Sequence, residues 1–411
     1  MSEKPYTINN SLLTKLRIAL VHDDFTQFGG GESIFLAIKE LFPTAAIYTS
    51  LVTKEWVKRI ASSQQSGASS RKIFTSFMQK LPFKKKLQRA YFPLYPLAFE
   101  SFDFSDFDLV ISSSTRFAHG IITKPQTKHL CYMHSPGRMF WESKSYFGEK
   151  SKLRSLLSPV LAYLRLWDFT VAQRVDQFLT NSKHTAAKIA KYYHREARVV
   201  YPFVDLERFK TNDYRLMSNN YFRPEEGNKV LEPKAKGSYY LVVSRLTRWK
   251  RVDLAVKAAL EVGVPLKVVG DGPDRKRLER LVLKHQITKS PNNQITFLGW
   301  VSGEELAKLF QGCQALVMPQ EEDFGITSLE AQASGRPVVA FKAGGALETI
   351  MVGKTGEFFY PQTAEALIFA LKKFQAGRYD PQACRKNAER FSKRRFQEQF
   401  IEEVMASVNG K

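Results

Sequence analysis

The sequence predicts an α/β protein of two consecutive parallel-sheet domains, and three observations support this prediction. The first is the length of 411 residues, which exceeds the roughly 150 residues of one ordinary domain. The second is an apolar run at 16–22 that leads through Gly29-Gly30-Gly31 into a helical pattern at 32–41. This order of strand, glycine loop and helix is typical of the start of a Rossmann-like sheet. The third is that the alternation of strand and helix patterns weakens after residue 205 and restarts at residue 239.

Short apolar runs locate the remaining strands of both halves. In the first half we expect strands at 109–112, 129–134, 177–181 and 197–201, with helices between them. In the second half we expect strands at 239–243, 266–269, 295–298, 315–318 and 337–341. The polar stretch 211–238 contains two prolines and two glycines and indicates a loop or linker.

These patterns divide the chain into four parts. They are a first domain at 1–205, a linker at 206–238, a second domain at 239–385 and a final segment at 386–411. A basic amphipathic helix is expected from about Ala388 to Val408. Ligands of open parallel sheets bind beside the carboxyl ends of the strands, so two such domains predict a ligand cleft between them.

The net charge of +22 predicts a polyanionic neighbour, which is nucleic acid, an anionic membrane surface or a phosphorylated ligand. Between residues 71 and 89 the chain has seven lysines and arginines and no acidic residue. Apolar and aromatic residues alternate with these cations as far as Leu97. Residues 71–97 are therefore typical of a membrane-interface helix, and a solvated face over a partly buried helix is the alternative.

Three further features of the composition limit the class of protein. The longest apolar runs are shorter than the ~20 residues of a membrane span. The amino terminus lacks the layout of a signal peptide, so a cytoplasmic location is expected, peripheral on the inner face of the membrane. Cys131, Cys313 and Cys384 have no metal-ligand spacing, and neither a metal nor a cofactor is expected.

Two segments of the second half have residues typical of phosphate-binding sites. Arg245 and Lys250 follow a buried strand, where a forked donor and a point charge suit a diphosphate. The residues Gly325-Ile326-Thr327 begin a helix, whose free backbone N–H groups bind phosphate oxygens. Glu330, one turn into that helix, is placed to accept hydrogen bonds from ribose hydroxyls. Glu322, in the preceding loop, is placed to bind hydroxyls of a transferred sugar.

The order and spacing of these segments resemble family 4 of the retaining glycosyltransferases. The matching segments are Ser244-Arg245 to Lys250, Gly270-Asp271-Gly272-Pro273, Phe297-Leu298-Gly299, Glu322 to Gly325, Glu330-Ala331, Gly335-Arg336-Pro337-Val338 and Gly344-Gly345. The resemblance implies the metal-independent GT-B fold, in which two Rossmann-like domains face each other across a deep cleft. It implies that Arg245 and Lys250 bind the donor diphosphate, that Glu330 binds the ribose and that Glu322 contacts the donor sugar. We expect the final segment to pack back on the first domain.

The first half is similar to the branch that contains bacterial O-antigen and exopolysaccharide mannosyltransferases. The similarity lies in 108–114, in Cys131 to Trp141, in 167–176 and in 201–205. It implies that His134 lies near the donor sugar and that Arg138 and Trp141 face the cleft. It also implies that Gly30 and Gly31 lie under the donor phosphates. Asp24 is a weaker candidate for the acceptor side, and structural capping explains it equally well.

This chain departs from the branch at Gly137, Met139 and Phe203, and these departures lie near the expected sugar and acceptor pockets. Without the resemblance, His134 would be interpreted as an ordinary structural histidine at a strand end.

The expected reaction is transfer of a hexose with retained anomeric configuration, with mannose favoured. The donor is a nucleotide-diphosphate sugar, GDP-linked by preference and UDP-linked as the alternative. The acceptor is a glycan, lipid-linked, in cell-surface polysaccharide synthesis. Glu322, His134, Arg245 and Lys250 are the expected catalytic residues.

Other classes of protein stay open at this point. They are a UDP-sugar-dependent transferase of another hexose, a GT-B nucleotide-sugar epimerase, a two-domain phosphorylase and a glycosyltransferase-like scaffold. A nucleic-acid-binding protein is a remote alternative, because no recognition module is present.

Overall fold

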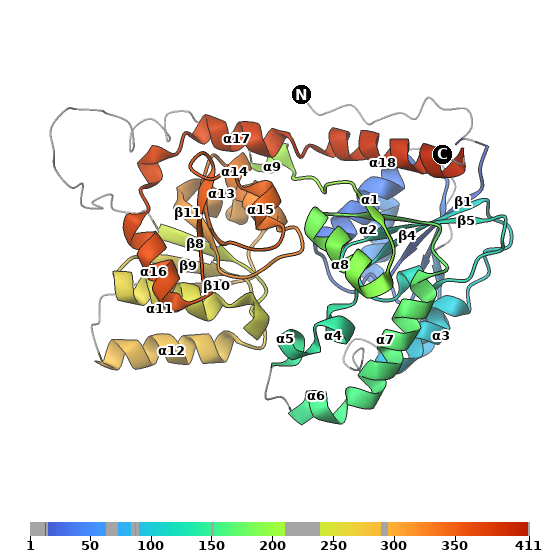
Figure 1. The fold of residues 1–411 in the computed structure, drawn as a ribbon, viewed down its shortest axis with the longest axis horizontal. Coiled ribbons are helices and arrows are strands. Elements are labelled where there is room, and N and C mark those ends of the chain that lie inside the picture. The colour runs from blue at the N-terminus through green and yellow to red at the C-terminus, as the bar shows by residue number, and fades with distance from the viewer. Residues whose placement is uncertain are drawn as a thin grey trace. The chain divides into compact units, whose positions relative to one another are not determined.

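The chain forms two compact units, residues 1–203 with 393–411, and residues 204–392. The computed structural model describes residues 13, 15–62, 73–83, 87, 90–148, 152–209, 239–288 and 295–409. Each unit is built on its own sheet, and the two are described separately (Figure 1). Most of the predicted linker, 210–238, lies outside the described residues. Its first four residues, Leu206–Phe209, are helical and belong to the second unit.

The first unit has a seven-stranded sheet in the order β3-β2-β1-β4-β5-β6-β7. Its strands are β1 Ile18–His22, β2 Ala46–Thr49, β3 Ile73–Thr75, β4 Leu109–Ser114, β5 Lys128–Met133, β6 Gln177–Thr180 and β7 Ala197–Val199. Every neighbouring pair is parallel. The strand order reverses between β1 and β4, which is the switch point where open sheets bind ligands. The central strands are buried throughout, which explains their continuous apolar runs.

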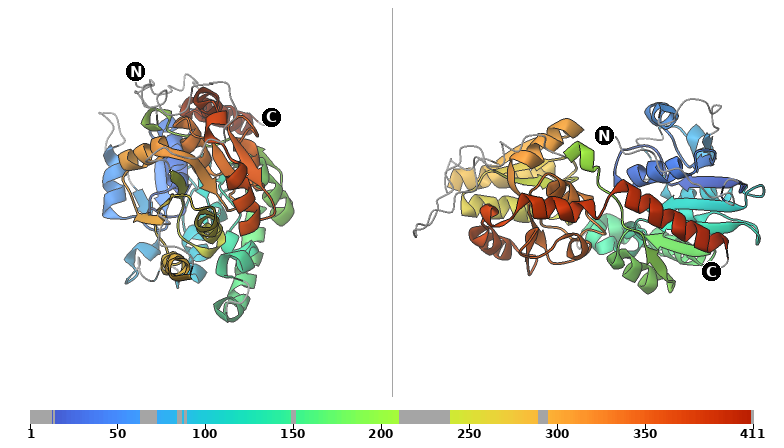
Figure 2. Two further views of the ribbon diagram at one scale, coloured as in Figure 1. Left: turned by 90° about the vertical axis from the view of Figure 1, so that its left-hand side faces the viewer. Right: turned by 90° about the horizontal axis from the view of Figure 1, so that it is seen from above.

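Helices cover both faces of this sheet (Figure 2). They are α1 Gly30–Leu41, α2 Lys54–Ser62, α3 Tyr95–Glu100, α4 Arg138–Trp141, α5 Ser143–Phe147, α6 Lys152–Leu156, α7 Ser158–Ala172, α8 Lys183–Tyr193 and α18 Lys393–Val408, with short 3-10 turns η1 Phe77–Lys80, η2 Phe92–Leu94 and η3 Ala118–Gly120. One apolar core joins the sheet to α1, α2 and α18, another joins it to α3 and α7, and a third, smaller one joins it to α8. The predicted parallel α/β class is confirmed for this unit.

The second unit has a six-stranded parallel sheet in the order β10-β9-β8-β11-β12-β13. Its strands are β8 Tyr239–Val243, β9 Leu266–Val269, β10 Ile295–Gly299, β11 Cys313–Met318, β12 Val338–Phe341 and β13 Gly356–Phe359. Its helices are α9 Leu206–Phe209, α11 Val252–Val262, α12 Arg275–Thr288, α13 Gly303–Gly312, α14 Ile326–Ala333, α15 Ala346–Thr349, α16 Ala364–Lys373 and α17 Pro381–Glu389, with the 3-10 turns η4 Arg248–Lys250 and η5 Ala376–Arg378. The strand order reverses again, here between β8 and β11.

The helix predicted from about Ala388 to Val408 is α18, which ends at Val408 but begins five residues later, at Lys393, because a separate helix, α17, precedes it. Helix α17 ends at Glu389 and α18 begins at Lys393. Helix α17 packs on α14 in the second unit. Helix α18 places Phe396, Phe400 and Val404 in the core of the first unit. The apolar stripes of the two helices thus belong to different cores, and the chain breaks between them.

The predicted membrane-interface helix at 71–97 lies partly outside the described residues. The described part of this segment forms strand β3, turns η1 and η2 and the start of α3, and not one continuous helix. Residues 71–72, 84–86 and 88–89, which carry six of the seven cations, lie outside the described residues. Large apolar side chains are nevertheless exposed here, including Phe83 at 73% and Leu97 at 60%. Among the described helices, none is long and apolar enough to cross a membrane.

Candidate functional site

The loop after β8 is held in place by glycines of the loop after β9. At Gly270, where φ is +115°, a Cβ would lie 2.0 Å from the Ser244 carbonyl oxygen. At Gly272 a Cβ would lie 2.3 Å from the Leu246 carbonyl oxygen. The Leu246 N–H also donates to the Asp271 carbonyl oxygen at 2.9 Å. Only glycine allows this close approach, so the Gly-Asp-Gly motif positions the loop that carries Arg245 and Lys250.

Lys250 and Glu322 form an ion pair, although they are 72 residues apart. Their side chains are 13% and 17% exposed. Gln320 Nε2 donates to Glu322 Oε1 at 2.8 Å, and the Lys250 ammonium lies 4.1 Å from the centroid of the Trp249 ring. The sequence predicted these two residues for different parts of a ligand, and the structure brings them together. The Arg245 side chain, from the same loop as Lys250, is exposed.

The start of α14 offers backbone donors beside this ion pair. Gly325 precedes the helix with φ +89° and ψ +61°, a left-handed conformation that favours glycine. Among the described residues, no side chain caps this helix start. The N–H groups of Ile326 and Thr327 therefore lie at the positive end of the helix, where anions bind.

The loop before α14 rests against a second pair of glycines. A Cβ on Gly344 would lie 2.2 Å from the Glu322 carbonyl oxygen, and one on Gly345 would lie 2.3 Å from Phe324 Cα. The Gly345 N–H donates to the Glu322 carbonyl oxygen at 2.8 Å. The Gly-Gly motif thus holds the backbone of Glu322 close to the start of α14.

Glu330 lies one turn into α14 and is partly buried. Burial raises its pKa to about 7, while the nearby Arg208 opposes this rise and Asp205 adds to it. The Arg208 N–H donates to Asp205 Oδ1 at 3.2 Å, and α9 packs against α14. Arg208 was not predicted as a site residue, because its position in the expected linker gave no sign of a contact with α14.

In the first unit, His134 follows β5 and is buried at 9% exposure. Its Nε2 lies 2.9 Å from Ser113 Oγ at the end of β4. Its backbone carbonyl accepts from Asn181 Nδ2 at 2.8 Å. A Cβ on Gly31 would lie 3.7 Å from His134 Nε2, so the first turn of α1 lies directly against the ring. The structure therefore brings His134 together with Gly31, in the first turn of α1, at the carboxyl ends of β4 and β5.

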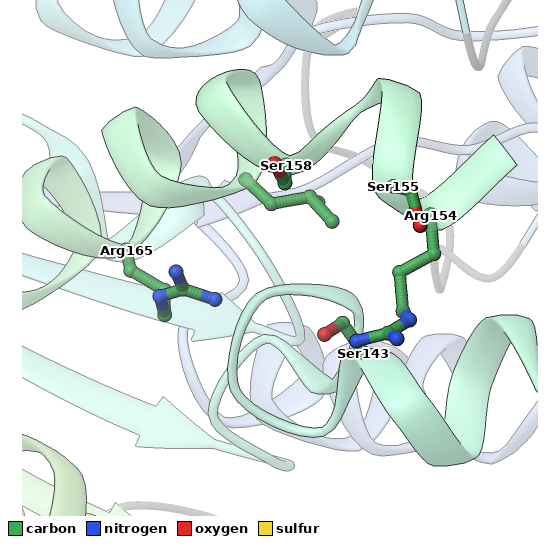
Figure 3. Close-up of a pocket in the computed structure, with 6 residues that line it drawn as sticks. Ser143, Arg154, Ser155, Ser158 and Arg165 are labelled. Carbon is green, nitrogen blue, oxygen red and sulfur yellow. The ribbon is translucent and has the colours of Figure 1, made fainter. Parts of the chain in front are cut away.

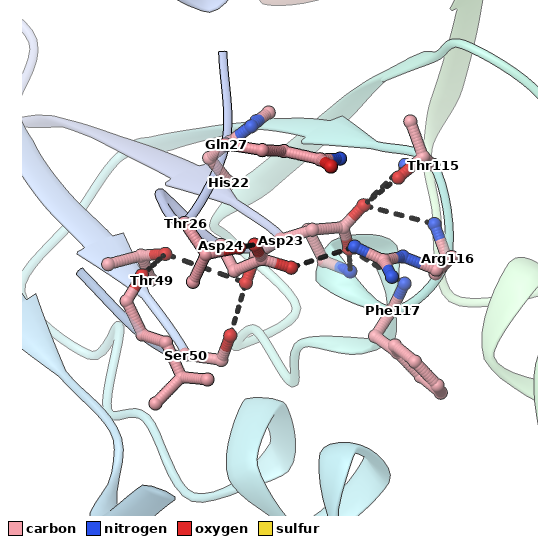
Figure 4. A network of polar contacts seen from close by, with 12 residues as sticks. His22, Asp23, Asp24, Thr26, Gln27, Thr49, Ser50, Thr115, Arg116 and Phe117 are labelled. Atoms are coloured by element: carbon pink, nitrogen blue, oxygen red, sulfur yellow. Dashed lines mark hydrogen bonds and ion pairs between the residues drawn. The ribbon is translucent and has the colours of Figure 1, made fainter. Parts of the chain in front are cut away.

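A buried ionic network follows β1 (Figure 4). Asp23 accepts hydrogen bonds from backbone N–H groups of 115–118, at 2.6 to 3.1 Å. Asp24 pairs with the Arg116 guanidinium at 2.7 Å. Burial acts to raise the pKa of Asp23, but the Arg116 charge and these hydrogen bonds hold it below its usual value. Asp24 is only 3% exposed, so its ion pair with Arg116 lies inside the protein and holds the loop that follows β4 in place.

Glu32, in the first turn of α1, lies close to this network. Burial raises its pKa to about 7, a backbone hydrogen bond opposes the rise and the charge of Asp24 adds to it. Neither Glu32 nor Arg116 was predicted from the sequence as a site residue. Two adjacent aspartates directly after a buried strand indicate that a cation lies close by, because a buried charge requires a partner of opposite charge.

Trp141 and Arg138 are both engaged within the protein. Trp141 Nε1 donates to Asp168 Oδ2 at 2.6 Å, and its ring stacks on Tyr192 at 4.8 Å. Arg138 Nε lies 3.4 Å from Glu142 Oε2. The structure also explains the departure at Gly137, because a Cβ there would lie 2.4 Å from the buried ring of Phe140.

Comparison with known proteins agrees with this architecture. The model "Glycosyltransferase Family 4" matches residues 28–208, and the model "Glycosyl transferases group 1" matches residues 224–391. An uncharacterised glycosyltransferase of Methanocaldococcus jannaschii is 31% identical over 32% of this chain and 34% of its own length. An alpha-1,3/1,6-mannosyltransferase of Dictyostelium discoideum is 26% identical over 84% of this chain and 87% of its own.

A solved structure shares the two-domain fold. The Anabaena protein HepE, crystallised with UDP and glucose, has a TM-score of 0.66 at 17% identity and covers 95% of this chain and 100% of its own. The predicted fold class is confirmed by this likeness. The chain spans only about a third of the length of the archaeal relative.

Proposed function

Because the chain belongs to the family 4 glycosyltransferases of the GT-B fold, we propose that it transfers a hexose from a nucleotide-diphosphate sugar to a glycan with retained anomeric configuration. The observation that carries the donor site is the Lys250–Glu322 ion pair beside the start of α14. It combines a cation, a carboxylate and backbone donors in one part of the second unit. A sugar diphosphate has a complementary group for each of them.

The roles of these residues follow from the charges that the reaction develops. As the glycosidic bond breaks, negative charge grows on the leaving diphosphate and positive charge on the sugar ring. Lys250, Arg245 and the N–H groups of Ile326 and Thr327 stabilise the leaving group, as preorganised electrostatics. Glu322 orients Lys250 and binds sugar hydroxyls. Glu330 accepts hydrogen bonds from the ribose.

No carboxylate of the second-unit site is proposed as a covalent nucleophile, since Glu322 is engaged by Lys250 and Gln320. The proposed route is therefore a front-face displacement, in which the leaving phosphate takes the proton of the acceptor hydroxyl. His134 of the first unit is proposed to contact a sugar. Neutralisation of the diphosphate by Arg245 and Lys250 requires no metal, so EDTA should leave turnover unchanged; loss of activity in EDTA that Mg²⁺ restores would contradict this.

GDP-mannose is the preferred donor in this proposal, and mannose is the transferred sugar. The alpha-1,3/1,6-mannosyltransferase relative supports mannose, whereas HepE was crystallised with UDP. A thermal-shift panel of GDP, UDP, ADP and their sugars tests the choice. A ligand at a hundred times its dissociation constant stabilises the protein by about 2.7 kcal/mol. No shift with any nucleotide would contradict the donor site, and conversion of the nucleotide sugar without an acceptor would indicate an epimerase.

The acceptor is proposed to be lipid-linked, in cell-surface polysaccharide synthesis, with the protein peripheral on the inner face of the membrane. The net charge of +22 and the exposed Phe77, Phe83 and Leu97 support an anionic membrane surface as partner. Sedimentation with liposomes tests this. We expect binding to vesicles with anionic lipid that falls as salt increases; equal binding to neutral vesicles would contradict it.

A further inference from the structure

A polar pocket in the first unit lies apart from the residues discussed so far (Figure 3). It has a volume of about 290 Å³ and is lined by Ser143, Arg154, Ser155, Ser158, Leu161 and Arg165. These residues come from α5, α6 and α7. Figure 3 shows Arg165 on one side of the pocket and Arg154 with Ser143 on the other. This volume is at the small end for ligand pockets, which suits a compact polar group.

The lining of the pocket is complementary to an anion. It presents two guanidinium groups and three hydroxyls, and none of the described residues that line it is acidic. Glu142, the neighbour of Ser143, is engaged by Lys188 at 2.6 Å and by Arg138. Arg165 Nη1 donates to the Phe140 carbonyl oxygen at 3.1 Å, which holds its side chain in place. Planar guanidiniums with fixed donors are the groups that bind phosphate best.

The start of α7 adds to this positive potential. Ser158 is the first residue of this 15-residue helix and also lines the pocket. Among the described residues, no side chain caps the helix start. The positive end of the helix macrodipole therefore lies at the wall of the pocket.

The helix that supplies Arg154 and Ser155 also exposes apolar side chains. Leu153 is 54% exposed and Leu156 is 76% exposed, one helical turn apart on α6. Exposed leucines beside a cationic pocket are typical of surfaces that meet the boundary between lipid headgroups and acyl chains.

We propose that this pocket binds a phosphate group, with Arg154 and Arg165 as its principal ligands and the hydroxyls and the α7 start as further donors. The phosphate can belong to a membrane lipid or to a free phosphate ester, and Leu153 and Leu156 would contact the lipid in the first case. The inference is independent of the donor site, which lies in the second unit. It assigns a second phosphate-binding site to the chain.

Isothermal titration calorimetry with glycerol 3-phosphate tests the pocket directly. The double variant Arg154→Gln/Arg165→Gln removes two cations from the lining. The control Lys58→Gln/Lys191→Gln removes two exposed cations elsewhere in the same unit, so that the net charge of the two variants is equal. We expect roughly tenfold or greater weakening in the first variant, from loss of charge-assisted hydrogen bonds, and little change in the control. Equal effects of the two variants would overturn the proposal.

A third variant excludes misfolding as the cause. Ser158→Glu adds a carboxylate to the pocket, but at a helix start, where a negative charge is favourable for stability. It should keep the melting temperature and still weaken binding of glycerol 3-phosphate. Wild-type affinity in Ser158→Glu would contradict the assigned pocket. Binding of GDP or UDP serves as a separate readout, because it reports the donor site and should be the same in all of these variants.

Vesicles distinguish the two sources of phosphate. Vesicles of phosphatidylcholine with phosphatidic acid are compared with phosphatidylcholine alone, for the wild type, the Arg154→Gln/Arg165→Gln variant and Leu153→Ser/Leu156→Ser. A lipid ligand predicts that both variants lose binding to phosphatidic acid, whereas only the arginine variant loses glycerol 3-phosphate. If both variants bind vesicles like the wild type and the arginine variant loses glycerol 3-phosphate, the ligand is a free phosphate ester. If neither probe binds in a way that depends on the arginines, there is no phosphate site.

Discussion

Replacement of Glu330 by glutamine should make the protein more stable and at the same time impair the proposed donor site. Burial raises the pKa of Glu330 from 4.5 to about 7, a change that corresponds to roughly 3 kcal/mol as an upper bound. The folded state holds this proton more tightly than the unfolded state. The ionisation of this carboxyl group therefore lowers the free energy of unfolding as pH rises from about 4.5 to about 7. Above pH 7 the free energy of unfolding stays lower by the full amount.

Because the ionised Glu330 lowers stability only at the higher pH, the experiment compares melting temperatures at pH 8 and pH 4. Glu330→Gln removes the cost of the buried charge, so its melting temperature should exceed that of the wild type at pH 8 and equal it near pH 4. Glu389→Gln, an exposed glutamate of the same unit, is the matched control and should change little at either pH. If Glu330→Gln is no more stable than the wild type at pH 8, the burial argument fails.

Binding of the nucleotide sugar depends on pH in the opposite direction. Only the ionised carboxylate accepts hydrogen bonds from both ribose hydroxyls. With a pKa near 7, about a tenth of the carboxyl is ionised at pH 6 and about nine-tenths at pH 8, so affinity should rise roughly tenfold. Calorimetry at pH 6 and pH 8 measures this change in affinity, with GDP-mannose as ligand or with UDP-glucose if the thermal-shift panel selects uridine. The phosphates of these ligands do not titrate in this range, so a change in affinity reports the protein. A wild-type affinity that is flat between pH 6 and 8 would refute the ribose role.

Three further predictions concern the loops and the core. Lys250→Ala or Glu322→Ala should lower kcat by roughly 10²- to 10³-fold with a much smaller effect on the melting temperature, and wild-type turnover in either variant would contradict the site. Gly270→Ala should lower turnover because its Cβ would meet the Ser244 carbonyl oxygen at 2.0 Å; Gly263→Ala, also at positive φ but with open space around it, is the control and should only cost about 1 kcal/mol of stability. Phe400→Ala should destabilise the first unit by about 3–5 kcal/mol, seen as faster amide exchange in β5 and α1, and protection like that of the wild type would mean that α18 is not part of that core.

The two domains could be predicted from the sequence because buried parallel strands are continuous apolar runs. Strands β8 and β9 appear with the predicted bounds, and the other predicted strands differ only at their ends. Strands β2, β3 and β13 were missed. Strand β3 is a half-exposed edge strand within a basic segment, and β13 has the sequence Gly-Glu-Phe-Phe, so neither has the run of apolar residues that marks a central strand.

The candidate site was predictable as a set of residue types, and its contacts were not. Glycines, a lysine and glutamates at definite spacings indicated a phosphate and sugar site. The pairing of Lys250 with Glu322, and the contact of the 244–246 loop with Gly270 and Gly272, depend on loops that follow different strands of one sheet. The raised pKa of Glu330 likewise depends on burial by neighbours from elsewhere in the chain.

The sequence by itself therefore predicted the class of fold, the resemblance to a glycosyltransferase family and a set of candidate phosphate-binding residues, because these follow from local periodicity and motif spacing. Tertiary structure alone decided where the chain breaks between α17 and α18, since each helix buries its apolar face in a different core. It also decided that Asp24 and Trp141 are engaged inside the first unit, and that Arg154 and Arg165 share one pocket. The physical reason is that burial and contact between distant residues are properties of the packed chain, and no local pattern encodes them.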